Sequence, residues 1–159
     1  MWFPLKTTEI DFVERSNHRF ENEAVIEAPA GRVFDLLVDG DGMARWFADF
    51  VACRWTSPGP HGVGSTREIE LKALTVKERF LVWEPGKRVA FAIYAITIPL
   101  VSRMVEDMEL EMLGPSRTRI LWRAHYEPSL AMRLVHPIGR AVFGKMFRKS
   151  LEGLSRAAR

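Results

Sequence analysis

The segment from Glu23 to Trp46 constrains the fold more than any other part of this 159-residue chain. Residues 23–28 alternate in side-chain character, which is typical of a strand with one buried face. Pro29 suits the first turn of a helix, where its missing N–H costs nothing. Residues 33–37 place four apolar side chains on one helical face, and Asp39-Gly40-Asp41 marks the start of a second short helix. The segment therefore predicts two small helices that brace one end of a sheet.

Six further runs of residues predict β-strands, and turn-forming segments rich in Gly and Pro separate them. One of these turns, Glu84-Pro85-Gly86-Lys87, predicts a hairpin. Short connections between successive strands favour an antiparallel meander. Together with the strand at 23–28, the sheet is expected to have seven strands. The later six are Phe50–Thr56, Gly64–Leu71, Leu74–Glu84, Lys87–Thr97, Leu100–Leu113 and Thr118–Glu127.

The end of the chain predicts a long amphipathic helix over residues 137–157. Apolar residues fill one half of its helical wheel, and charged residues, nearly all cationic, occupy the other half. A helix with one apolar face must pack against another apolar surface, and the sheet is the only candidate. Leu130, Leu134 and Ile138 point nearly opposite to that face, and a residue before Pro137 resists helical geometry. Residues 130–136 are therefore expected to form a separate short segment.

Composition and length indicate one globular domain without a transmembrane segment. Hydrophobic residues make up 47% of the chain and charged residues 27%, as is usual for globular proteins. No run approaches the roughly 20 apolar residues that span a bilayer, and we expect no secretion signal. The single Cys53 excludes an intramolecular disulfide, so we expect a cytoplasmic protein. Residues 1–18 are interpreted as an N-terminal extension and residues 19–159 as a single ligand-binding domain.

The order of these elements, together with several short sequence matches, resembles the polyketide cyclase/dehydrase and lipid-transport superfamily. This superfamily is related to START domains and the birch-pollen allergen. The matches extend from about residue 20 to 155 and comprise Val25-x-x-Ala28-Pro29, Val33-Phe34-Asp35-Leu36-Leu37, Asp39–Trp46, Glu78-Arg79, Trp83-Glu84-Pro85-Gly86-Lys87-Arg88, Thr118-x-x-x-Trp122 and Leu151-Glu152-Gly153-Leu154. The resemblance implies an α+β helix-grip fold, in which a curved seven-stranded antiparallel sheet wraps around the long C-terminal helix. It also implies a cavity between sheet and helix that holds an apolar or amphipathic small molecule.

Glu106 is the leading candidate for acid–base chemistry. It shares strand parity with Met104 and Met108, whereas Asp107 and other charged residues of the run 100–112 have the opposite parity. A carboxylate among methionines on an inward face would be desolvated, which raises its pKa toward neutrality. The alternative is that Glu106 reaches solvent or pairs with a cation, because paired structural carboxylates also have perturbed pKa values.

Glu78 and Arg67 form a second pair of candidates on inward-facing strand positions. Glu78 shares parity with Val76 and Phe80, but an unpaired buried charge is strongly disfavoured, which favours a structural role. Arg67 could be the cation that compensates Glu78. Alternatively, it could bind the carboxylate or stabilise the enolate of a ligand.

Residues on the apparent inward faces are the candidates for contact with a ligand, although most such residues in any domain form plain core. The candidates are Phe80, Phe91, Ile93, Met104, Met108, Ile120, Trp122, Phe143 and Phe147. Methionine adapts to irregular apolar shapes, which suits a ligand of loose specificity. The four histidines show no metal-ligand spacing, and His125 is predicted to face outward. We therefore expect neither a metal site nor a cofactor.

The segment from Ser129 to Arg159 is basic, with seven Lys or Arg residues and Glu152 as its one acid. The cations are either a solvated helix face, favourable to the helix dipole near the C-terminus, or a contact with an anionic membrane surface. Aromatic residues are not interleaved with these cations and no recognition module is present, so we expect no nucleic-acid partner.

Two functions remain open on the sequence alone. The first is binding or carriage of a hydrophobic small molecule that is lipid-like or resembles an aromatic polyketide. The second is an enzyme of the polyketide cyclase/dehydratase kind, in which Glu106 or Glu78 moves protons and Arg67 stabilises an enolate. Positioning a reactive chain can itself supply several kcal/mol, so such an enzyme needs no sharp catalytic motif.

Overall fold

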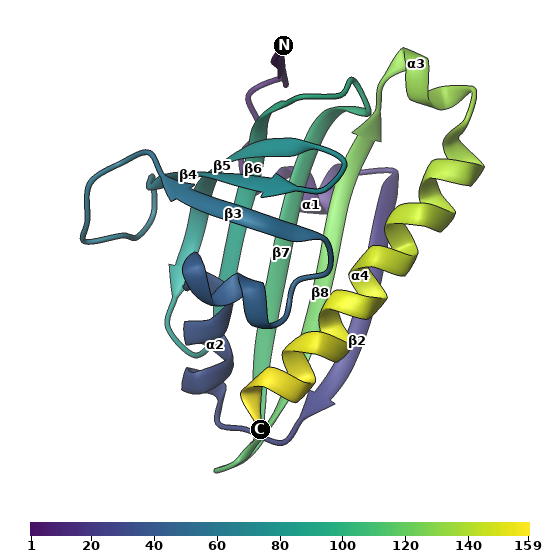
Figure 1. Ribbon diagram of the computed structural model, residues 1–159. Coiled ribbons are helices and arrows are strands. Elements are labelled where there is room, and N and C mark those ends of the chain that lie inside the picture. The colour runs from purple at the N-terminus through teal and green to yellow at the C-terminus, as the bar shows by residue number, and fades with distance from the viewer.

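The strands form one antiparallel sheet in the computed structural model, which describes residues 1–159 (Figure 1). The strand order is β2-β8-β7-β6-β5-β4-β3, so β2 and β3 lie at opposite edges. These seven strands are β2 (His18–Ile26), β3 (Phe50–Trp55), β4 (Thr66–Leu71), β5 (Thr75–Glu84), β6 (Arg88–Ile96), β7 (Val101–Gly114) and β8 (Arg117–Pro128). The two-residue strand β1 (Phe3–Pro4) pairs with β6 as an eighth strand. The α+β architecture with a meander and a long C-terminal helix is therefore confirmed.

Two short helices carry the chain from one edge of the sheet to the other, between β2 and β3. They are α2 (Ala30–Val38) and the 3₁₀ helix η1 (Asp41–Arg45). Pro29 is extended and immediately precedes α2, so the strand ends where the helix begins. Val33, Phe34 and Leu37 of α2 are buried in the main core, which closes one end of the sheet as the sequence pattern predicts.

The long helix α4 (His136–Ala158) lies across the same face of the sheet as α2 (Figure 1), and one helical turn, α3 (Leu130–Arg133), precedes it. Its apolar face buries Phe147, Leu151 and Leu154 against the main core. At the C-terminal end of the helix, Arg32 of α2 donates a hydrogen bond from Nε to the carbonyl oxygen of Ala158, with a separation of 2.6 Å. This bond satisfies one of the carbonyls that a helix C-terminus leaves free.

The N-terminal segment, residues 3–17, begins in the sheet as β1 and then crosses to the opposite face, where residues 10–13 contribute to a small second core. Phe12, in the one-turn helix α1 (Phe12–Arg15), is buried against Ala92 of β6 and Val105 of β7. His125 does point to this outer face, but it is buried, and its Nδ1 lies 2.7 Å from the hydroxyl of Ser16. A strand position that faces away from the main core is therefore not necessarily exposed to solvent here.

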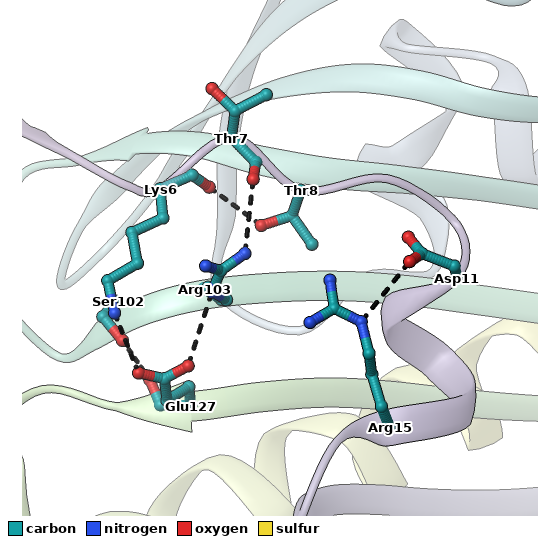
Figure 2. Close-up of polar contacts among 8 residues, drawn as sticks. All are labelled: Lys6, Thr7, Thr8, Asp11, Arg15, Ser102, Arg103 and Glu127. Atoms are coloured by element: carbon teal, nitrogen blue, oxygen red, sulfur yellow. Dashed lines mark hydrogen bonds and ion pairs between the residues drawn. The ribbon is translucent and has the colours of Figure 1, made fainter.

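Polar contacts hold this N-terminal segment to β7 and β8 (Figure 2). Lys6 Nζ lies 3.2 Å from a carboxylate oxygen of Glu127, and Arg103 Nε lies 3.4 Å from the other oxygen. Arg103 also donates from Nη1 to the carbonyl oxygen of Thr7, with a separation of 3.3 Å. These contacts bind the segment to β7 and β8, while Phe3 and Leu5 at its start pack against the main core.

The closest approach between α4 and η1 depends on Gly153. A β-carbon at this position would lie 2.3 Å from the carbonyl oxygen of Trp46, whereas one at Gly31, in α2, would meet nothing within 4 Å. We therefore expect Gly153→Ala to lower the free energy of unfolding by about 1–3 kcal/mol, because backbone atoms must move apart. Gly31→Ala, the matched control in a helix, should be neutral or stabilising by up to about 1 kcal/mol. Equal effects of the two substitutions in urea unfolding would contradict this role of Gly153.

Candidate functional site

A largely apolar cavity lies between α4 and the sheet. It has about 970 Å³ of free space, its open mouth included, and 22 of its 28 lining residues are hydrophobic. Of the nine residues predicted to contact a ligand, seven line it: Phe91, Ile93, Met104, Met108, Trp122, Phe143 and Phe147. Phe80 and Ile120 are fully buried but are not among the lining residues. The cavity has the apolar lining with few polar groups that is typical of small-molecule sites.

Arg67 and Glu78 form a buried ion pair in the cavity wall. They lie directly opposite each other on the neighbouring strands β4 and β5, so both side chains project from the same face of the sheet. Arg67 Nε donates to Glu78 Oε2 at 2.7 Å, and both side chains are almost completely excluded from solvent. Of the two roles open to Arg67 from the sequence, pairing with Glu78 is therefore present in the structure.

One nitrogen of the Arg67 guanidinium makes no hydrogen bond. Its Nη1 is buried and has no hydrogen-bond partner. The rings of Trp55, Phe80 and Phe91 lie 5.5, 4.9 and 5.7 Å from its central carbon, so aromatic side chains surround it. An unpartnered buried donor is costly to the folded protein.

Glu106 lies on the same inner face, two strands away from Glu78. Its carboxyl is buried, and Trp122 Nε1 donates to Oε1 at 2.9 Å. Burial and, to a smaller extent, the charge of the neighbouring Glu78 raise the pKa of Glu106 to about 8, although the hydrogen bond from Trp122 and the charge of Arg67 oppose the rise. Glu106 therefore carries a proton at neutral pH and can donate it.

Arg67 carries the one positive charge among the three groups Arg67, Glu78 and Glu106, so it can balance one ionised carboxylate. Burial raises the pKa of Glu78, and the Arg67 guanidinium opposes this rise through its charge and its hydrogen bond. Because the guanidinium keeps its proton, one carboxylate must stay ionised to balance it. Glu78, in direct contact with Arg67, is that carboxylate, and Glu106 is the neutral acid. The site thus places a proton donor and an unsatisfied cationic donor in one apolar cavity.

A second polar cluster lies where the cavity lining reaches the exposed start of α4. The hydroxyl of Tyr126 lies 2.7 Å from His136 Nε2 and accepts a hydrogen bond from Arg140 Nη1 at 2.9 Å. His18 packs against His136, with ring centroids 4.9 Å apart. Burial, followed by electrostatic interactions with His136, Arg140 and Arg133, lowers the pKa of His18. Arg140 therefore supplies a positive charge and a hydrogen-bond donor where the cavity lining reaches the exposed start of α4.

Sequence reasoning missed His136 and Arg140 as lining residues. Their spacing of four residues places them on one face of α4, so helical periodicity could have found them once the helix was known to border the cavity.

No group of three or more His, Cys, Asp or Glu side chains in the chain could hold a metal ion. Burial raises the pKa of the Cys53 thiol to about 11, so it is protonated and not a nucleophile at neutral pH. Arg67, Glu78 and Glu106 are the acidic and basic side chains that the sheet contributes to the cavity, and His136 and Arg140 are those that α4 contributes.

The protein family described as "Polyketide cyclase / dehydrase and lipid transport" matches residues 17–159 of the chain. An uncharacterized protein of Mycobacterium tuberculosis is 28% identical over 142 residues, which cover 89% of this chain and 81% of that protein.

Solved structures share the fold at low sequence identity. The Zhui aromatase/cyclase of Streptomyces sp. R1128 superposes with a TM-score of 0.77 at 18% identity, covering 89% of this chain and 93% of that chain. A START superfamily protein of Mycobacterium smegmatis gives a TM-score of 0.67 at 14% identity, covering 89% and 94%. At these identities the likeness establishes the helix-grip fold.

The raised pKa of Glu106 makes the stability of the fold depend on pH. Between its ordinary pKa of 4.5 and about 8, the folded protein holds a proton on Glu106 that the unfolded chain has released. Raising the pH through this interval should therefore destabilise the fold, by about 1 kcal/mol per pH unit. Glu106→Gln keeps a neutral side chain that can accept from Trp122 and should remove this contribution. Urea unfolding of both proteins from pH 5 to 8 measures the difference, and parallel stability curves would contradict a protonated Glu106.

Proposed function

The chain belongs to the polyketide cyclase/dehydrase and lipid-transport family, and on that basis we propose that it binds an amphipathic, largely hydrophobic small molecule between α4 and the sheet. The family and the fold support a ligand-binding or cyclase-like role in general. The observation that carries the specific proposal is the unpartnered Nη1 of Arg67 in the wall of an apolar cavity. The ligand thus has an apolar body and at least one oxygen that accepts from Arg67. A cytoplasmic setting, in which Cys53 stays reduced, is part of this proposal.

The position of the polar groups defines how such a ligand lies. Arg67, Glu78 and Glu106 project from β4, β5 and β7, whereas His136 and Arg140 lie on α4. Met104, Met108 and Phe143 are among the apolar residues that line the cavity. A ligand with oxygens at both ends and an apolar middle would satisfy this arrangement, and the flexible methionines allow for variation in its shape.

A second candidate function is catalysis on a poly-β-keto substrate, and the neutral state of Glu106 favours it. The substrate carbonyl would accept from Arg67, which stabilises the enolate formed when the carboxylate of Glu78 takes the α-proton. In a dehydration step, Glu106 would give its proton to the departing hydroxyl group, which leaves as water while the C=C bond forms. Both carboxyl groups would then exchange protons with solvent to restore the starting state.

Filling the cavity tests the binding proposal. Met104 lines the cavity, whereas Met112, on the same strand and of the same parity, is exposed and lies outside it. Met104→Trp should weaken binding of an apolar fluorescent probe such as a naphthalene sulfonate by at least about tenfold, which is about 1.4 kcal/mol. Met112→Trp, the matched control, should leave the affinity unchanged. Equal affinities of the two variants would place the probe elsewhere and refute the proposal.

Glu106→Gln separates the enzyme from the carrier. If Glu106 supplies a proton, turnover of a poly-β-keto mimic should fall by about 10²–10⁴-fold while affinity for the apolar probe is retained. Turnover by the unmodified protein should decline as the pH rises through about 8, because Glu106 then loses its proton. Failure of the unmodified protein to turn the mimic over would reject catalysis on that substrate and leave the carrier function.

A further inference from the structure

The start of α4, together with α3, exposes an unusual concentration of large apolar side chains. Five of the twelve exposed large hydrophobic residues of the chain lie between residues 130 and 142: Leu130, Leu134, Val135, Ile138 and Val142. Leu134 is 89% exposed and Ile138 is 69% exposed. We refer to these five residues as the apolar stripe. Contiguous exposed apolar residues typically mark a surface that contacts a protein or a membrane.

The same side of α4 becomes cationic farther along the helix. Lys145, Lys149 and Arg156 follow Ile138 at helical spacing, so they continue the exposed side on which the stripe begins. Arg148 is also exposed, next to them. α4 therefore has a buried face against the sheet and an outer face that is first apolar and then basic.

These cations differ from most of the others in having no acidic partner. None of the seven Lys and Arg residues between 129 and 159 forms a salt bridge. On β8, by contrast, Arg117 and Arg119 lie 3.2 and 3.5 Å from Glu27 and Glu23. The positive charge of the C-terminal segment is thus left available for an external anion.

We propose that the apolar stripe and the cations of α4 dock the protein onto an anionic lipid membrane. None of the helices has the length and apolar character needed to cross a bilayer, so the contact is at the interface. Apolar side chains would enter the boundary between head groups and acyl chains, while Lys145, Arg148 and Lys149 lie at the phosphates. A second copy of the chain fits the surface less well, because a symmetric contact would bring the unpaired cations of both copies together.

The docked orientation would bring the cavity to the membrane. The segment that carries the stripe also lines the cavity, through Met132, His136, Gly139 and Phe143. One side of this segment therefore faces the interior and the other side would face lipid. An apolar molecule could then pass between bilayer and cavity along α3 and the first turns of α4. Docking itself needs no ligand, so it stands independently of the proposed function.

Co-sedimentation of the full chain with vesicles tests the proposal. The unmodified protein should sediment with vesicles that contain phosphatidylglycerol, should bind vesicles of phosphatidylcholine alone much more weakly, and should be released by added salt. Lys145→Gln/Lys149→Gln should weaken binding to the anionic vesicles about 30-fold. Leu134→Ser/Ile138→Ser should weaken it at least about tenfold, because apolar contact area is lost.

Matched controls separate this surface from general charge and hydrophobicity. Lys72→Gln/Lys87→Gln removes the same charge from exposed positions elsewhere, and Val63→Ser/Met112→Ser removes exposed apolar side chains elsewhere. Both controls should bind as the unmodified protein does, and circular dichroism should show all four variants folded.

Three results would overturn the proposal. The first is no sedimentation with anionic vesicles, and the second is equal loss of binding in the control variants. The third comes from light scattering: a dimer that dissociates on Leu134→Ser/Ile138→Ser would assign the stripe to a second copy of the chain.

Discussion

The rest of the site depends on one guanidinium that is buried in an apolar cavity wall with two carboxyl groups. Arg67 and Glu78 are paired at 2.7 Å, and burial, followed by the charge of Glu78, raises the pKa of the nearby Glu106. A buried ion pair of this kind adds little net stability, because desolvation of both charges offsets their attraction. Breaking it by removing one partner would leave a buried charge uncompensated. The unpartnered Nη1 of Arg67 is a further cost to the folded protein alone, which an oxygen of a bound molecule would remove.

The arrangement of the sheet and α4 creates the cavity in whose wall the Arg67 guanidinium is buried. β4 and β5 lie toward one edge of the sheet and β8 and β2 toward the other, and α4 runs along the β8 and β2 side (Figure 1). At its C-terminal end α4 is fixed by Arg32 and by the close approach of Gly153 to Trp46, so the helix packs tightly there. At its start, α3 and the first turns of α4 line the cavity and are exposed. The cavity is thus closed by α2 and η1 at one end and accessible at the other.

Periodicity in the sequence was sufficient to predict the sheet, the two short helices and α4, because each has one buried face. It also placed Arg67, Glu78 and Glu106 on the inner face. Parity does not say which inward residues border a cavity, so Phe80 and Ile120, which pack fully in the core, could not be separated from Met104 and Phe143.

Parity also placed Asp107 and His125 on the outer face of the sheet, but it could not predict that both residues are buried there. Asp107 forms two hydrogen bonds with Arg88, and His125 contacts Ser16 of a segment that has no periodic pattern. The division into an extension at 1–18 and a domain at 19–159 stays a prediction.

The central claim, that this cavity holds a ligand, is tested most directly by mass spectrometry of small molecules released on denaturing gently purified protein. We predict an apolar compound with at least one oxygen function, present in near-stoichiometric amount in the unmodified protein and depleted in Met104→Trp. A compound that is retained equally by Met104→Trp, or the absence of any compound enriched over the Met104→Trp sample, would contradict the account.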